Sequence, residues 1–136
     1  PTSGAMGYAL PAAISAKLAR PKFPAIAFAG DGGFAMTMSE LETAVRMNIK
    51  SLVTLVFNNS SYGTISRHQN REFPGRKLCT DLTEMNFSEI AKGMGAMGFR
   101  VSNNEEFFKI FQDSLNLERP SVIDIKIPAN NFNAWD

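Results

Sequence analysis

The sequence has a single cysteine, Cys79, among its 136 residues, so the chain cannot form a disulfide within itself. This fits a reducing compartment, and we expect the protein in the cytoplasm. No charge dominates either: 14 Lys and Arg stand against 13 Asp and Glu, unlike the basic composition of proteins that bind nucleic acid or anionic membranes. All apolar runs are much shorter than the roughly 20 residues that cross a bilayer. We therefore expect neither nucleic acid nor a membrane as a partner.

Two short apolar runs predict a pair of parallel β-strands. They span Pro24–Ala29 and Leu52–Phe57, and the segment between them has helical periodicity. A strand, a helix and a second strand in this order form a βαβ unit, whose crossover is right-handed. The carboxyl ends of its two strands open into one crevice.

Polar residues and glycines follow both strand ends. The first strand leads into Gly30-Asp31-Gly32-Gly33, and the second leads into Asn58-Asn59. Asp31 and Asn59 each lie two residues past a strand end, so we expect a carboxylate and an amide oxygen to meet in the crevice. Oxygen ligands beside the backbone N–H groups of glycines suit a divalent cation that holds a phosphate or diphosphate.

The rest of the chain alternates between helix and strand signals. A helix begins near Pro11 and ends at Pro21, and Thr37-Met-Ser-Glu40 has the capping-box pattern that opens a second helix. Periodicity vanishes from 58 to 86, where we expect a long loop. The remaining signals are a helix opened by Asn86, a strand at 99–101, a helix capped by Asn103 and a strand at 121–127. The alternation predicts one α/β domain over 1–136, with three layers (α/β/α) and a mainly parallel sheet.

Two other interpretations of the glycine-rich turn stay open from the residues alone. A turn with one Asp, like an Asn pair after a strand, is common in ordinary tight connections. Gly30-x-Gly32-x-x-Ala35 also satisfies the relaxed fingerprint of dinucleotide-binding Rossmann domains. Two features weigh against a dinucleotide: Asn58 stands where an acidic residue would bind the ribose, and Asp31 would repel a pyrophosphate unless a cation intervened.

Gly30-Asp31-Gly32 followed by Asn58-Asn59 resembles the diphosphate and metal signature of thiamine-diphosphate-dependent enzymes. A second match, Gly4–Ile14, is similar to the segment that precedes this signature in the acetolactate synthase, benzoylformate decarboxylase and pyruvate decarboxylase group. The resemblance implies the C-terminal thiamine-diphosphate-binding (PP) domain of such an enzyme. It also implies that the cofactors are thiamine diphosphate and Mg²⁺.

The resemblance assigns roles to individual residues. It implies that Asp31 and Asn59 bind the metal through their side chains, and Ser61 through its backbone carbonyl. Met6 would prop the cofactor into a bent shape and bind its pyrimidine ring through the backbone N–H. The other cofactor contacts would come from glycine backbone: the N–H groups of Gly32, Gly33 and Gly63 for the diphosphate, and the carbonyl of Gly4 for the 4′-amino group.

The resemblance also shows what this chain lacks. In the family, a Glu from a pyrimidine-binding domain of a neighbouring subunit activates the cofactor, and no segment here resembles that domain. We therefore expect a fragment of a longer, homo-oligomeric enzyme, or one subunit of a split enzyme, that is inactive alone. The whole enzyme would act on 2-oxo acids by decarboxylation, carboligation or both. A non-catalytic α/β module that binds only metal and diphosphate is the alternative.

The substrate side of the site is less well defined. His68, the only histidine, stands where acetolactate synthases carry a Trp that shapes the acceptor pocket, so the chain departs from that pattern. An acid–base residue and a solvated loop histidine are both consistent with this position. The same segment is basic, which fits either binding of a substrate carboxylate or a charged loop face: Arg67, Arg71, Arg76 and Lys77.

Overall fold

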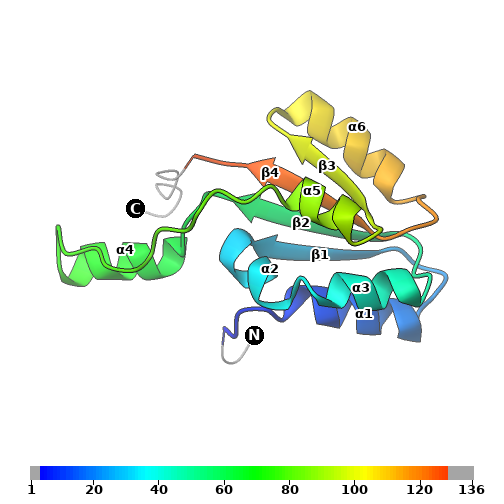
Figure 1. The fold of residues 1–136 in the computed structure, drawn as a ribbon, viewed down its shortest axis with the longest axis horizontal. Coiled ribbons are helices and arrows are strands. Elements are labelled where there is room, and N and C mark those ends of the chain that lie inside the picture. The colour runs from blue at the N-terminus through cyan, green and yellow to red at the C-terminus, as the bar shows by residue number, and fades with distance from the viewer. Residues whose placement is uncertain (1–3, 129–136) are drawn as a thin grey trace.

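The core of the structure, a computed structural model that describes residues 4–128, is a sheet of four parallel strands. The strand order is β1-β2-β4-β3, and each neighbouring pair is parallel (Figure 1). The strands are β1 (Ala25–Gly30), β2 (Leu52–Asn58), β3 (Met97–Val101) and β4 (Ser121–Lys126). The predicted parallel α/β fold is therefore confirmed, and the predicted strands differ from the observed ones only at their ends.

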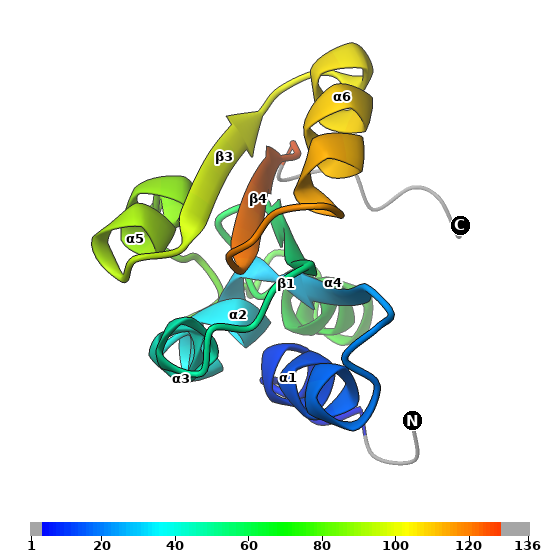
Figure 2. The same cartoon turned by 90° about the vertical axis from the view of Figure 1, so that its right-hand side faces the viewer.

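Helices cover both faces of this sheet, but unequally (Figure 2). One face packs under α1 (Ala9–Ala19), α2 (Asp31–Thr37), α3 (Glu40–Arg46) and α5 (Phe87–Gly93). Here Phe34 of α2 meets Phe87 of α5 edge-on, with ring centroids 5.3 Å apart and both side chains buried. The two helices therefore pack against each other within one of the helix layers that the alternating pattern predicts.

The second face carries α6 (Asn104–Ser114) as its cover among the described residues. Phe107, Ile110 and Phe111 of this helix pack against the sheet near β3 and β4. Over β1 and β2 the same face stays open, and Phe28 and Phe57 stack there with centroids 6.4 Å apart and their side chains exposed. The described part of the chain therefore presents an uncovered apolar half-face.

The predicted capping box at Thr37–Glu40 is wrong, although a helix does begin at Glu40. The crossover contains two helices, and Ser39 between them has helical dihedral angles (φ −57°, ψ −28°) and no side-chain capping bond. The N-cap of the predicted box would be Thr37, and an N-cap residue needs an extended backbone to turn its side chain onto the first N–H groups. Thr37 is the last residue of α2 and therefore does not meet that condition. Thr37 instead donates its hydroxyl to the carbonyl oxygen of Gly7, at 2.9 Å.

The long loop expected over 58–86 contains a helix, α4 (Gly63–Glu72). None of the residues of α4 is buried, and Figure 1 shows the helix projecting beyond the carboxyl ends of the strands. Apolar periodicity arises from a face that packs against a core, so an unpacked helix leaves no such signal. This is why the sequence did not predict it.

The two predicted asparagine caps are confirmed. Asn86 accepts the N–H of Glu89 at 3.2 Å at the start of α5, and Asn103 accepts that of Glu106 at 2.9 Å at the start of α6. Within residues 4–128, no helix is long and apolar enough to cross a membrane.

Candidate functional site

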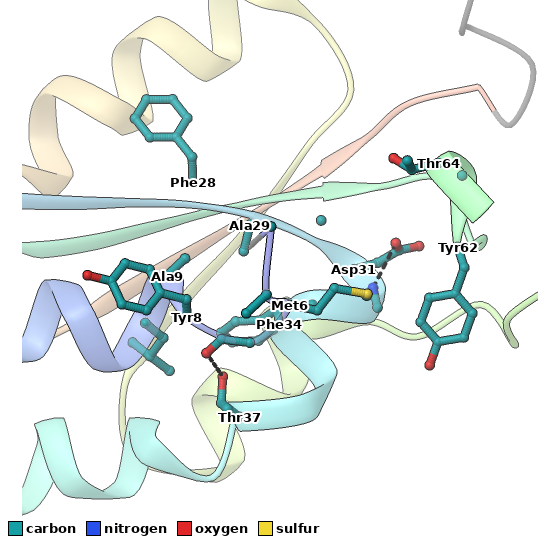
Figure 3. A pocket seen from close by; sticks show the side chains of 18 of the residues that line it. Met6, Tyr8, Ala9, Phe28, Ala29, Asp31, Phe34, Thr37, Tyr62 and Thr64 are labelled. Carbon is teal, nitrogen blue, oxygen red and sulfur yellow. Dashed lines mark hydrogen bonds between the residues drawn. The ribbon is translucent and has the colours of Figure 1, made fainter. Parts of the chain in front are cut away.

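A cavity of about 670 Å³ opens at the carboxyl end of β1 (Figure 3). Three segments line it: residues 4–10, the end of β1 with the start of α2, and residues 61–65. All but one of the predicted site residues lie on its wall: Gly4, Met6, Asp31, Gly32, Gly33, Ser61 and Gly63. The exception is Asn59, which is buried and does not line the cavity.

Asp31 sits where β1 passes directly into α2. Gly30 is the extended N-cap residue, so Asp31 is the first helical residue and its negative charge lies at the positive end of the helix dipole. The side chain is only 3% exposed. Its Oδ1 accepts the N–H of Gly32 at 2.8 Å, and its Oδ2 accepts the N–H of Ser61 at 3.2 Å. Two backbone donors therefore hold the carboxylate, and each oxygen keeps a lone pair for another partner.

Asn59 meets the same donor as Asp31. Its Oδ1 accepts the N–H of Ser61 at 3.1 Å. A carboxylate oxygen and an amide oxygen from two neighbouring strand ends therefore converge on one backbone nitrogen. This is the juxtaposition expected from the parallel pairing of β1 and β2.

Asn58, the other member of the pair, belongs to a different environment. Its Nδ2 donates to the carbonyl oxygen of Met85 at 2.9 Å and to Asp124 Oδ1 at 3.0 Å. Asn58 is only 1% exposed, so its side chain is buried in the protein interior. Only Asn59 is placed to act with Asp31.

The donor set of the cavity fits a hard divalent cation. Asp31 and Asn59 offer oxygen atoms, which Mg²⁺ prefers. No cluster of three or more His, Cys, Asp or Glu side chains that could hold a metal exists within residues 4–128. A cation at Asp31 must therefore take most of its ligands from amide or carbonyl oxygens, water and the oxygens of a bound anion such as a diphosphate.

Two of the backbone N–H groups predicted to bind the diphosphate have partners inside the loop. That of Gly32 donates to Asp31 Oδ1, and that of Gly63 donates to the carbonyl oxygen of Ser61 at 2.8 Å. To bind a diphosphate, Gly63 would have to release the same carbonyl that is predicted to bind the metal. The two predicted roles at Ser61 and Gly63 are thus coupled in one tight turn.

Glycines shape the turn that carries Met6. Gly4 (φ +62°) and Gly7 (φ +81°) both adopt left-handed conformations that disfavour side chains. Between them, Met6 lines the cavity and is 45% exposed. The hydroxyl of Thr37 holds the carbonyl of Gly7, so α2 anchors this turn, a role the sequence pattern did not reveal.

Tyr62 is a further wall residue that the sequence did not single out. A Cβ atom built on Gly32 would lie 2.4 Å from the Tyr62 ring, so the ring packs directly over the glycine. A small residue at position 32 therefore serves the packing of Tyr62 as well as access to the backbone N–H. A contact between a single aromatic ring and a single glycine follows no helix or strand periodicity, so the sequence pattern could not predict it.

His68 and the basic residues after it lie on or beyond α4, past the segment that lines the cavity. His68 Nδ1 lies 3.3 Å from Arg71 Nη2, and Arg71 Nε pairs with Glu72 Oε1 at 2.9 Å. Lys77 pairs with Asp81. In this structure at least part of the basic stretch is therefore a face of paired surface charges.

The sequence was compared with known families and proteins. The family model described as "Thiamine pyrophosphate enzyme, C-terminal TPP binding domain" matches residues 1–125. Sulfoacetaldehyde acetyltransferase of Alcaligenes xylosoxydans xylosoxydans is 40% identical over 115 residues, which are 85% of this chain and 19% of that protein. Acetolactate synthase of Bacillus subtilis (strain 168) is 33% identical over 129 residues, covering 94% of this chain and 22% of the synthase.

A solved structure gives the same result. The thiamine diphosphate-dependent 4-hydroxybenzoylformate decarboxylase of Rhodococcus jostii RHA1 superimposes with a TM-score of 0.87 at 30% identity. The match covers 94% of this chain and 24% of the decarboxylase. The chain thus spans about a fifth to a quarter of the proteins it matches.

Proposed function

This chain belongs to the thiamine pyrophosphate enzymes, as their C-terminal cofactor-binding domain, and we propose that it supplies the Mg²⁺- and diphosphate-binding half of an active site that acts on 2-oxo acids. The observation that carries the proposal is the convergence of Asp31 Oδ2 and Asn59 Oδ1 on the N–H of Ser61. A cation there would join the protein oxygens to the diphosphate. Family membership also decides against the dinucleotide interpretation of the glycine-rich turn.

Each predicted residue has a task in this proposal. Asp31, Asn59 and the carbonyl of Ser61 would hold the cation. The N–H groups of Gly32, Gly33 and Gly63 would bind the diphosphate, with no side chain to keep it away. The turn at Gly4 and Met6 would hold the pyrimidine ring, with Met6 as the apolar support of the bent cofactor.

When bound, thiamine diphosphate supplies a nucleophilic carbon that adds to the carbonyl of a 2-oxo acid and accommodates the electrons released on decarboxylation. The relatives catalyse different reactions by name: acetyl transfer, acetolactate synthesis and decarboxylation. We propose decarboxylation, carboligation or both for the whole enzyme, as in acetolactate synthases. Product analysis of the full-length protein with a panel of 2-oxo acids tests this, and binding of cofactor without any product would favour the non-catalytic module.

The isolated domain is expected to convert no 2-oxo acid. The proposal places the activating Glu on the pyrimidine-binding domain of a neighbouring subunit in a homo-oligomer. Glu40 and Glu42 cannot replace it because they lie on α3, whose residues do not line the cavity. The open apolar face at Phe28 and Phe57 should also make the isolated domain self-associate.

Turnover of pyruvate or benzoylformate by purified residues 1–136 measures this directly, with the Asp31→Ala domain as the matched background. Turnover above that background would show that the domain carries a complete site. Light scattering or sedimentation of the same samples reports the self-association.

Met6→Gly is expected to separate cofactor binding from cofactor activation. The substitution removes the apolar support but leaves Asp31 and the glycine N–H groups in place, so the diphosphate should remain anchored. Exchange of the thiazolium C2 proton in the bound cofactor of the full-length enzyme should slow by at least about tenfold. This corresponds to an increase of about 1.4 kcal/mol in the activation free energy of exchange. Unchanged exchange at full occupancy would mean that Met6 only fills space.

A further inference from the structure

We infer that Asp124, acting through Asn58, is a positioning residue that holds the 58–61 turn in the conformation that brings Asn59 and Ser61 to Asp31. The inference rests on the proposed function for its consequence, metal binding. It rests on the contacts of the structure for its geometry. Asp124 does not line the cavity, and the hydrogen bonds that it accepts come from Asn58 and Phe87 and not from a proposed ligand, so its effect is indirect.

Asp124 is a fully buried carboxylate in β4, which lies between β2 and β3. Its Oδ1 accepts Nδ2 of Asn58 at 3.0 Å, and its Oδ2 accepts the N–H of Phe87 at 3.1 Å. Nε of Arg100 lies 4.0 Å from Oδ2. A buried charge is unfavourable unless such partners surround it, and an apolar residue would pack at this position without that requirement. We therefore attribute the presence of this carboxylate to the hydrogen bonds that it accepts from Asn58 and Phe87.

Asn58 carries this constraint into the turn. Its Nδ2 is used by Asp124 and by the carbonyl of Met85, which fixes the orientation of the amide plane. The opposite atom, Oδ1, then faces the turn and accepts the N–H of Ser60 at 3.3 Å. If Asp124 did not hold Nδ2, the amide could rotate away from Ser60.

Ser60 is the strained residue of the turn. Its φ of +55° is left-handed, a conformation that is unfavourable for a residue other than glycine. Its N–H binds Asn58, its carbonyl accepts the N–H of Leu82 at 2.9 Å, and its hydroxyl lies 3.4 Å from Nζ of Lys126. Strained residues persist where the surrounding contacts determine them, and they occur frequently at functional sites.

The strained position lies directly between two proposed metal ligands. Asn59 precedes Ser60 and Ser61 follows it, so the left-handed step sets the direction of both. With the turn held, Asn59 Oδ1 and Asp31 Oδ2 share the N–H of Ser61. Without this constraint, Ser60 would leave its left-handed conformation. Asn59 and Ser61 would then move away from Asp31 in the metal-free protein.

The test uses the full-length protein with the near-isosteric substitution Asp124→Asn. Titration calorimetry of Mg²⁺ at saturating thiamine diphosphate should show affinity weakened by about 10- to 100-fold, as is typical when a residue that orients a metal ligand is lost. In the metal-free protein, amide hydrogen exchange over residues 59–61 should become faster. The second readout needs no cofactor, so it tests the geometry even if the proposed function fails.

Val122→Ala is the matched control. Val122 is fully buried in the same strand, two residues before Asp124 and therefore on the same face of the sheet. Its truncation should lower the unfolding midpoint without changing Mg²⁺ affinity or exchange over residues 59–61. If Val122→Ala weakened Mg²⁺ binding as much as Asp124→Asn, the effect would be one of general stability and the inference would be overturned.

A second variant keeps the test decisive if Asp124→Asn does not fold. The double exchange Asn58→Asp with Asp124→Asn restores a donor and an acceptor between the two strands and keeps an acceptor for the N–H of Ser60. It should recover at least part of the lost Mg²⁺ affinity and loop protection. Wild-type affinity within twofold and wild-type exchange in Asp124→Asn, or in Asn58→Ser where Asp124→Asn does not fold, would overturn the inference.

Discussion

Asp31→Ala is expected to abolish Mg²⁺-dependent binding of thiamine diphosphate to the full-length enzyme. The substitution removes the one acidic side chain that the described residues bring to the cavity wall. It also removes the acceptor of the Gly32 N–H and one of the two acceptors of the Ser61 N–H. Breaking a buried charge interaction costs about 3–5 kcal/mol, which corresponds to at least about a 100-fold loss in affinity. Calorimetry of cofactor binding at fixed Mg²⁺ measures it.

The control for this prediction is Asp113→Ala. Asp113 is an exposed carboxylate on α6, the helix on the opposite face of the sheet, so its loss should leave cofactor binding unchanged. A chelator should reduce binding to wild type and to Asp113→Ala alike. Equal cofactor affinity of the wild-type enzyme with and without chelator would refute the metal bridge, whatever Asp31→Ala does.

Gly98→Ala is expected to cause the largest loss of stability of any glycine-to-alanine substitution in the described part of the chain. A Cβ on Gly98 would lie 1.9 Å from the carbonyl oxygen of Ser88 and 2.7 Å from its carbonyl carbon. Both are backbone atoms of α5, so the clash cannot be relieved by rotating a side chain. The helix would have to move away from β3, and we expect a loss of about 3 kcal/mol or more.

Gly93→Ala is the matched comparison, because Gly93 lies on α5 and a Cβ there would meet nothing within 4 Å. This substitution should be neutral or stabilise by about 0.5–1 kcal/mol, since alanine favours helix over glycine. Thermal unfolding and limited proteolysis of the full-length variants distinguish the two. Equal midpoints for Gly98→Ala and wild type would mean that α5 does not depend on close contact with β3.

Movement of α5 would also reach the cofactor site. The N–H of Phe87, at the start of this helix, binds Asp124, which holds Asn58. Gly98→Ala should therefore weaken Mg²⁺ binding in addition to lowering stability, whereas Gly93→Ala should weaken neither. Comparing Mg²⁺ binding by the two variants therefore tests whether the packing of α5 on β3 affects the turn that carries Asn59.

The sequence by itself was sufficient for the elements that interact locally or bury a regular face. The strands at 24–29 and 52–57 are recognisable as short apolar runs, and Asn86 and Asn103 cap their helices through bonds to residues three positions ahead. The order of strand ends then predicted that Asp31 and Asn59 lie close together, and both accept the N–H of Ser61. The family to which the chain belongs was predicted from two motifs, Gly30-Asp31-Gly32 with Asn58-Asn59 and the segment Gly4–Ile14.

Only the tertiary structure decided what depends on neighbours distant in the sequence. Thr37 binds Gly7 instead of capping α3, and Asn58 binds Asp124 in another strand. Gly98 must be small because α5 lies against it. Periodicity and capping patterns report the energies of residues within a few positions of each other, whereas each of these outcomes arises from hydrogen bonds or packing that exist only once the sheet has assembled.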